Sequence, residues 1–186
     1  MEADLIVRAQ AGDHAAYETL VSTHEAAVFR LAYLIVGDAD AAQDVAQDAF
    51  VRAYQQLDRF DPARPFRPWV LHITRNLARN HRRSLARYLA AVQRLFVNVP
   101  HTAASAESEQ FQQQEARALW EAIRRLPDQE QEVIYLRFML ALSVRETAEV
   151  LNIPPGTVKS RLSRALRRLK GVVQHHFPLL TEGRSS

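Results

Sequence analysis

Two stretches of the chain carry many basic side chains and no acidic residue, and they are the first candidates for chemistry. The first lies between Asp61 and Glu107 and contains Arg64, Arg67, Arg75, Arg79, Arg82, Arg83, Arg87 and Arg94. The second lies between Glu149 and Glu182 and contains Lys159, Arg161, Arg164, Arg167, Arg168 and Lys170. Guanidinium groups bind phosphate oxygens and guanine edges through a planar set of donors. Although the net charge is only +3, this segregation predicts two surfaces for nucleic acid.

Acidic residues gather in a third place. No basic residue precedes Arg52 in the run that holds Asp38, Asp40, Asp44 and Asp48. Acids at the start of a helix favour its macrodipole, which explains the first two. Asp44 and Asp48 lie farther along the predicted helix, on one face with Gln47. These two acids therefore need an explanation other than helix stability.

Nothing in the sequence predicts a catalytic site, a metal or a cofactor. The absence of cysteine removes disulfides, thiolate metal sites and cysteine nucleophiles. His24-Glu25 lacks the second histidine of a metalloprotease motif, and the pair His175-His176 is more typical of a solvent-facing tail. The first residues lack the order of a signal peptide, and the longest apolar run, Leu31 to Val36, is too short to span a bilayer. We expect a cytoplasmic protein that is not an enzyme and does not insert into a membrane.

Apolar residues recur at intervals of three and four along most of the chain, which predicts an all-α protein. A first helix is expected from Glu2 to Ala11, stopped by Gly12. Asp13 is placed to cap a long second helix that Gly37 ends, and Asp38 is placed to cap a third helix.

The rest of the chain divides into a loop, a long helix, a linker and further helices. Prolines between Asp58 and Pro68 predict an ordered loop, followed from about Pro68 by the helix that carries the arginines. Residues 96–111 are polar and lack an apolar stripe, which predicts an interdomain linker. Helices resume at about Gln112, and Asp128 is expected to cap one of them. The predicted organisation is an N-terminal helical domain, 1–95, the linker, a C-terminal domain, 112–174, and a tail, 175–186.

The segment from Ser143 to Lys170 has the pattern of a helix-turn-helix. Ser143 and Glu146 have the spacing of a capping box at the start of a helix. Pro154 and Pro155 stop that helix, and either can open the next one because proline is tolerated in a first turn. The second helix has an apolar stripe and a basic outer face. A basic helix after a tight turn fits the DNA major groove.

Ordered motifs in both halves carry a family resemblance. The N-terminal half reads D-A-A-Q-D-V-A-Q-D-A-F-V-R-A-Y, then R-F-D-P-A-R-P-F-R-P-W-V, then I-T-R-N-L-A-R-N-H-R-R. The C-terminal half reads L-P-x-x-x-x-x-V-I-x-L-R-F, then L-S-V-R-E-T-A-E-V-L-N-I-P-P-G-T-V-K-S-R-L-S-R-A. The chain resembles bacterial RNA polymerase sigma factors, specifically the two-domain extracytoplasmic-function (ECF) group of the sigma-70 family. The resemblance implies a subunit that binds core RNA polymerase, recognises the −10 and −35 promoter elements and directs transcription initiation.

The resemblance also implies partners. Asp44, Gln47 and Asp48 would dock on the clamp helices of the largest polymerase subunit, and Phe50 would either flank that face or belong to the core. The flap region of the polymerase is a second expected contact, and the linker would run through the active-site cleft and the RNA exit path. An anti-sigma factor is a further candidate partner.

For the −10 element, the resemblance implies the proline loop and the helix behind it. A base flipped from the non-template strand would enter the loop, and arginines would neutralise phosphates. Trp69 would be either a wedge at the fork or part of the core. The candidate residues are Phe60, Asp61, Arg64, Phe66, Arg75, Asn76, Arg79, Arg82 and Arg83, with Asn76 at the family's base-contacting position.

For the −35 element, the resemblance implies the second helix of the helix-turn-helix. Groove-reading residues would be Lys159, Ser160, Ser163 and Arg164, with Arg164 suited to a bidentate guanine contact. Thr157, Arg161 and Arg167 complete the candidate set, and the two arginines, with Arg168, would contact phosphates. The alternative is a stand-alone helix-turn-helix transcriptional regulator, which gives no role to the acidic face or to the proline loop.

Overall fold

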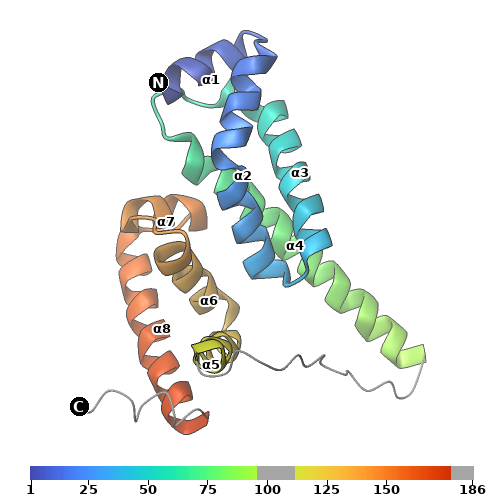
Figure 1. Ribbon diagram of the computed structural model, residues 1–186, viewed down its shortest axis with the longest axis vertical. Helices are drawn as coiled ribbons and strands as arrows, with labels where there is room; N and C mark the ends of the chain where they lie inside the picture. The colour runs from blue at the N-terminus through green and yellow to red at the C-terminus, as the bar shows by residue number, and fades with distance from the viewer. Residues whose placement is uncertain (96–111, 177–186) are drawn as a thin grey trace.

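The computed structural model describes residues 1–95 and 112–176, which form two helical regions without any strand (Figure 1). The predicted linker, 96–111, and most of the predicted tail, 177–186, lie outside the described residues. The N-terminal region contains α1 to α4, and the C-terminal region contains α5 to α8. The prediction of an all-α protein with a helix-turn-helix in its second part is confirmed.

The predicted starts of the first three helices are confirmed, and so is the end of the second helix at Gly37. α1 spans Glu2–Gln10. The Asp13 carboxylate accepts a hydrogen bond from a backbone N–H at the start of α2, His14–Val36, and Gly37 ends this helix with a φ of 84°. The Asp38 carboxylate caps α3, Ala39–Gln56, in the same way. Glycine adopts this left-handed conformation without steric cost, so Gly37 makes the sharp turn between α2 and α3.

α2 is the central helix of the N-terminal region and packs against α1, α3 and α4. Its inward face buries Leu20, Val28, Leu31 and Ile35. By length and composition α2 also qualifies as a membrane span, but the core helix of a globular protein passes the same test. The buried inward face explains its apolar composition.

A 3-10 turn, Leu57–Arg59, and a loop connect α3 to α4, Phe66–Leu95. α4 begins two residues earlier than predicted, and Pro68 lies in its first turn. Proline is tolerated there because the N–H groups of a first turn have no partner within the helix. The Gln10 side chain of α1 holds the loop by donating to the carbonyl oxygens of Leu57 and Phe60, each at 2.8 Å.

The C-terminal region begins with α5, Gln112–Arg124, and α6, Asp128–Ile134. A π-helical turn, Tyr135–Met139, follows α6. The expected capping role of Asp128 is wrong: Pro127 takes the capping position, and Asp128 is the first residue of α6. Its carboxylate pairs with Arg82 of α4 instead of a backbone N–H.

The helix-turn-helix consists of α7, Val144–Leu151, and α8, Pro155–His176. The capping box is confirmed, because the Glu146 N–H donates to Ser143 Oγ at 3.1 Å and the Ser143 N–H donates to Glu146 Oε2 at 2.7 Å. Asn152 ends α7 in a left-handed conformation with a φ of 53°. Pro155 is the first residue of α8, as the sequence allows.

The two regions share one hydrophobic core. Val133, Leu136, Leu142 and Val150 of the C-terminal region are buried in the same cluster as side chains of α2 and α4. α7 packs directly against α4, the helix that carries the first set of arginines. The first basic surface therefore faces the C-terminal region, a contact that the sequence analysis, with two basic stretches on either side of a linker, did not predict.

Candidate nucleic-acid and protein interfaces

The predicted protein-binding face of α3 is exposed. Asp44, Gln47 and Asp48 point away from the core, because Val45 and Ala49 on the other side of the helix are buried. Within residues 1–95 and 112–176, neither carboxylate has an ion-pair partner. A negative ridge of this kind can bind a basic partner without breaking an intramolecular contact.

Phe50 lies at the edge of this face. It is half-buried, and it lines an open cleft of about 350 Å³ between α2 and α3 together with Phe29 and Gln47. Its backbone carbonyl accepts a hydrogen bond from the Tyr17 hydroxyl at 2.6 Å. Phe50 thus belongs partly to the core and partly to the border of the acidic face.

Phe60 and Phe66, which the resemblance assigns to DNA contact, are buried in the structure. Their exposed fractions are 6% and 0%. The centroids of the two rings lie 6.0 Å apart with the rings edge to face, and the Trp69 ring lies 4.4 Å from that of Phe60. In this arrangement protein atoms enclose both rings, so neither offers a face on which a base could stack, and their contact with DNA stays a prediction. The same packing places Trp69 against the core.

Among the candidate DNA-binding residues of the loop, Asp61 and Arg64 are exposed. Asp61 Oδ1 accepts a hydrogen bond from the Ala63 N–H at 2.9 Å, which stabilises the turn. The Arg64 guanidinium lies 4.0 Å from the carboxylate of Glu149 in α7. The candidate base-binding loop therefore borders the helix-turn-helix.

The arginines of α4 face acidic residues of α6. Arg75 Nη2 lies 2.8 Å from Glu132 Oε2, and Arg79 Nη1 lies 3.3 Å from Glu132 Oε1. Arg82 pairs with the carboxylate of Asp128, whereas Arg83 is exposed. The Glu132 side chain is only 4% exposed, so its charge is stabilised by these guanidinium groups in place of water.

Asn76 is exposed but linked to α7 through a histidine. Its side-chain amide lies 3.0 Å from His72 Nε2, and His72 Nδ1 lies 2.8 Å from the carbonyl oxygen of Val150. An amide nitrogen only donates, so Nε2 accepts and Nδ1 carries the hydrogen that is donated to Val150. The predicted base-contacting residue is thus part of the contact between the two regions.

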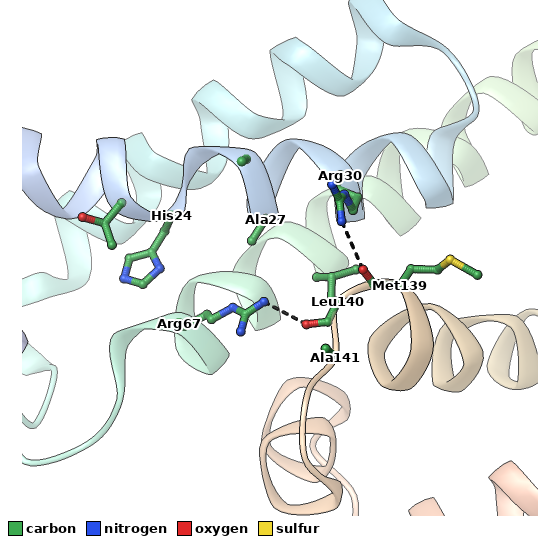
Figure 2. A pocket seen from close by; sticks show the side chains of 9 residues that line it. His24, Ala27, Arg30, Arg67, Met139, Leu140 and Ala141 are labelled. Carbon is green, nitrogen blue, oxygen red and sulfur yellow. Dashed lines mark hydrogen bonds between the residues drawn. The ribbon is translucent and has the colours of Figure 1, made fainter.

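Backbone carbonyls of the segment after α6 bind two further arginines. Figure 2 shows Arg67 of α4 donating to the Leu140 carbonyl at 2.9 Å and Arg30 of α2 donating to the Met139 carbonyl at 3.3 Å. Ala141, with a φ of 55°, turns the chain directly after these carbonyls. The residues line an open cleft of about 470 Å³ between the two regions.

The outer face of α8 is exposed along the length that the resemblance assigns to the −35 element. Val158 and Ala165 are buried on its inner face. Thr157 is half-buried, and its carbonyl accepts a hydrogen bond from Ser160 Oγ at 3.1 Å. The exposed candidates are Lys159, Ser160, Ser163, Arg164 and Arg167.

Two basic residues of α8 differ from these. Arg161 is half-buried, and burial lowers the pKa of its guanidinium, although the nearby charge of Glu132 raises it. Arg168 lies 3.5 Å from the carboxylate of Glu130, a residue of α6 in the same region. Arg161 therefore borders the contact with α4, and Arg168 contributes to packing within the C-terminal region.

No pattern in the sequence indicated the acids that bind the α4 arginines. Asp128 lies in the first turn of α6, where the macrodipole explains an acid as well as it does at Asp38, and Glu132 follows it one turn later. Arg75 and Glu132 are 57 residues apart, and no spacing rule connects residues at that separation. Only the folded arrangement brings the two charges together.

Both regions of the chain match models of known protein families. Residues 20–88 match the model of Sigma-70 region 2, and residues 116–169 match the model of Sigma-70 region 4. The first match covers α3, the loop and most of α4, and the second covers the helix-turn-helix.

Curated relatives match both regions together. ECF RNA polymerase sigma factor SigW of Bacillus subtilis is 31% identical over 173 residues, which are 89% of this chain and 92% of SigW. RNA polymerase sigma-H factor of Pseudomonas aeruginosa is 32% identical over 186 residues, which are 96% of this chain and 95% of that protein. ECF RNA polymerase sigma factor BldN of Streptomyces coelicolor is 34% identical over 167 residues. These are 89% of this chain and only 63% of the length of BldN.

Solved structures agree on the fold. CnrH, solved in complex with the cytosolic domain of CnrY, has a TM-score of 0.70 and is 28% identical, with 94% of this chain and 98% of CnrH covered. The sigma factor RpoE of Bartonella quintana, at 24% identity and a TM-score of 0.65 over 85% of this chain and 96% of that one, shares the fold. The motifs of both regions, their order and the relatives that span them lead to one conclusion: this chain belongs to the ECF RNA polymerase sigma factors of the sigma-70 family.

Proposed function

We propose that this chain is the promoter-specificity subunit of a bacterial RNA polymerase. It binds the core enzyme, engages the −10 and −35 elements of a promoter and directs transcription initiation. It acts in the cytoplasm by binding and contributes no catalytic group of its own. The proposal includes an anti-sigma factor as an inhibitory partner, a class that membership of the family implies.

One observation carries the proposal: exposed charges of opposite sign lie on separate helices. Asp44 and Asp48 form an unpaired acidic ridge on α3 within the described residues, which suits the basic surface of a protein partner. Lys159, Arg164 and Arg167 form an exposed basic face on α8, the second helix of the helix-turn-helix. A stand-alone DNA-binding regulator would need the basic face of α8, but it would have no use for the acidic ridge of α3.

In this proposal the acidic ridge binds the clamp helices of the largest polymerase subunit, and the C-terminal region contacts the flap. Asp61 and Arg64 of the loop and Asn76 of α4 contact the −10 element, with the arginines of α4 on its phosphates. The exposed face of α8 enters the major groove of the −35 element, where Arg164 is suited to a guanine edge. Phe60 and Phe66 hold the loop in shape.

The test reverses charge on the acidic ridge. The double variant Asp44→Lys, Asp48→Lys is expected to lose co-purification with core polymerase and run-off transcription, because like charges then face each other at the interface. The matched control is Asp58→Lys, Glu121→Lys, which changes the net charge equally at exposed sites elsewhere.

The control is expected to assemble and transcribe as the wild type does. Normal assembly of the ridge variant would show that α3 does not bind the polymerase. Tight, sequence-specific promoter binding by the chain alone, in a gel-shift assay without polymerase, would favour the stand-alone regulator.

A further inference from the structure

The loop between the 3-10 turn and α4 is held at both ends by the first helix. Gln10, the last residue of α1, donates from Nε2 to the carbonyl oxygens of Leu57 and Phe60, each at 2.8 Å. Glu2, the first residue of α1, accepts a hydrogen bond from the Phe66 N–H through Oε2 at 3.2 Å. One helix of nine residues, about 13 Å long, thus contacts the backbone on both sides of the loop.

These contacts enclose the part of the loop that the proposed function assigns to DNA. Asp61 and Arg64 are exposed, and they lie between Phe60 and Phe66, the two residues whose backbone α1 holds. Both contacts are made to main-chain groups, so they fix the path of the backbone whatever side chains the loop carries. The placement of the two exposed side chains therefore depends on α1.

α1 is itself anchored on the rest of the N-terminal region. Ile6 is fully buried in the core that α1 shares with α2 and α4. Arg8 Nη2 lies 2.6 Å from the carboxylate of Asp13, which also caps α2. The other oxygen of Glu2, Oε1, lies 2.9 Å from His24 Nε2 of α2, and this nitrogen donates because a carboxylate only accepts. The helix that holds the loop is thus fixed to α2 by packing and by charge.

We infer that Gln10 and Glu2 are positioning residues for recognition of the −10 element: they act through the loop, which they hold in the shape that receives a base. This rests on the proposed function, because it takes the loop as a base-binding element. A loop that is free before binding loses conformational entropy when it closes on a base, and a loop that is already held loses less. α1 lies before residues 20–88, the range that matches Sigma-70 region 2.

The test removes each contact in the full chain and pairs each variant with a matched control. Gln10→Met keeps a side chain of similar length without the donor, and Gln55→Met makes the same change at an exposed glutamine of α3. Glu2→Ala removes the acceptor at the start of α4, and Asp4→Ala removes an exposed acid from the same turn of α1. The two members of a pair change the net charge equally. A difference within a pair therefore reports the contact with the loop.

The first measurement uses polymerase assembled with each variant. The probe is a duplex fragment that the wild-type holoenzyme selects from a pool of random sequence, so no promoter needs to be known. The same fragment is made with single abasic sites in the non-template strand of the −10 region, located from the transcription start. An abasic site removes a base and keeps its phosphate, so the ratio of the two affinities measures base capture alone. A variant that only lowers the folded fraction weakens both affinities equally and leaves this ratio unchanged.

We expect the ratio to fall roughly fivefold in Gln10→Met and in Glu2→Ala, because a binding site works only while its groups are held to within about 0.5 Å of their productive positions. The controls Gln55→Met and Asp4→Ala are expected to keep the wild-type ratio. An unchanged ratio in either test variant would overturn the role of that residue.

The second measurement follows the loop in the free chain. The Trp69 ring lies 4.4 Å from that of Phe60, whose carbonyl Gln10 holds, so the fluorescence of Trp69 reports on the loop. The other tryptophan is removed by Trp120→Phe in every variant. Quenching of Trp69 by acrylamide is expected to increase in Gln10→Met and to keep the wild-type value in Gln55→Met. Equal quenching in both would overturn the inference, because the loop would then keep its shape without Gln10.

The readouts also separate this inference from the proposed function. A wild-type holoenzyme that selects no fragment, or that loses no affinity at any abasic site, would overturn the proposed function and the inference with it. A loss in the wild type with equal ratios in Gln10→Met and Gln55→Met would overturn the inference alone. If Gln10→Met does not fold, Gln10→Asn replaces it, because its amide is one methylene too short to bridge both carbonyl oxygens; the same differences from Gln55→Asn are then required.

Discussion

Arg164 is the residue on which base recognition by α8 depends most in the proposed function. It is exposed on the outer face, and its planar donors match the two acceptors of guanine in the major groove. Arg161, three residues earlier, is half-buried beside the contact with α4 and is less accessible.

We expect Arg164→Ala to weaken binding of the assembled polymerase to its promoter by roughly tenfold or more, because a bidentate base contact contributes about 1–3 kcal/mol of discrimination. Competition binding with promoter and mutated −35 fragments measures the effect. Lys170→Ala is the control, since it removes an exposed cation farther along the same helix. An equal loss in both variants would mean that Arg164 contributes only charge, and assembly with core enzyme should be normal in each.

At the level of single residues, the sequence predicted which side chains are exposed on α3 and α8 but not which aromatic rings are buried in the loop. Asp44, Asp48 and Arg164 could be placed because helical periodicity separates an apolar stripe from an outer face. Phe60 and Phe66 lie in or beside a loop, where no periodicity assigns a face. Their burial is decided by packing against Trp69, which only the folded chain shows.

The start of α7 shows how an element is fixed by a local pair of residues. Burial alone raises the pKa of Glu146, but the hydrogen bonds from Ser143 outweigh it, and the pKa of this carboxyl is lower in the folded chain than its ordinary value. A carboxyl whose pKa is lowered by folding stabilises the fold above its unfolded pKa and loses that contribution as the pH falls through the folded value.

We therefore expect Glu146→Gln to lower the free energy of unfolding at pH 7 by about 0.5–1 kcal/mol. The difference from the wild type should shrink as the pH falls below about 4, near the ordinary glutamate pKa, and on through the lower pKa of the folded chain, where the carboxyl of the wild type becomes protonated as well. Urea unfolding at both pH values tests this, with Glu121→Gln in α5 as an exposed control. A difference that is the same at both pH values would show that the charge plays no part in the cap.

The turn between α2 and α3 fixes how these helices meet. Gly37 has a φ of 84°, so Gly37→Ala is expected to lower the free energy of unfolding by about 1–2 kcal/mol, because a Cβ is strained in this conformation. Gly171→Ala, in the interior of α8 with no atom within 4 Å of the new Cβ, is expected to leave stability unchanged or raise it by up to about 1 kcal/mol. Thermal unfolding compares the two. Equal effects would mean that backbone strain does not matter at residue 37.

Helix ends were the best-predicted elements because their signals are local. Asp13, Gly37, Asp38 and the Ser143–Glu146 box act on backbone groups within a few residues of themselves. Asp128 shows the limit of this reasoning, because its carboxylate has two alternative partners, a backbone N–H of α6 and the guanidinium of Arg82 in α4, and it binds the second. Arg82 is 46 residues away in the chain, so a local pattern cannot predict this pair.

For the whole molecule, the sequence predicted two helical regions but not their contact. Phosphate-binding arginines and arginines paired with carboxylates look the same in a sequence, since both are basic residues on an outer helix face. Of the interface acids, Asp128 also resembles an ordinary acid of a first helical turn, and Glu132, four residues later, resembles an ordinary acid of a helix surface. The sequence also could not predict the shared core of Val133, Leu136, Leu142 and Val150. An apolar residue on a helix is predicted to be buried, but the pattern does not show which region it packs against.

The arginines that hold the segment after α6 bind its backbone and not its side chains. Arg30 and Arg67 donate to the carbonyl oxygens of Met139 and Leu140, which every amino acid carries alike. The two bonds therefore place no demand on the side chains at 139 and 140, which are constrained only by the packing of Leu140 and Met139 in the shared core. A comparison of sequences at these two positions would miss the docking, and its trace should be sought in the arginines.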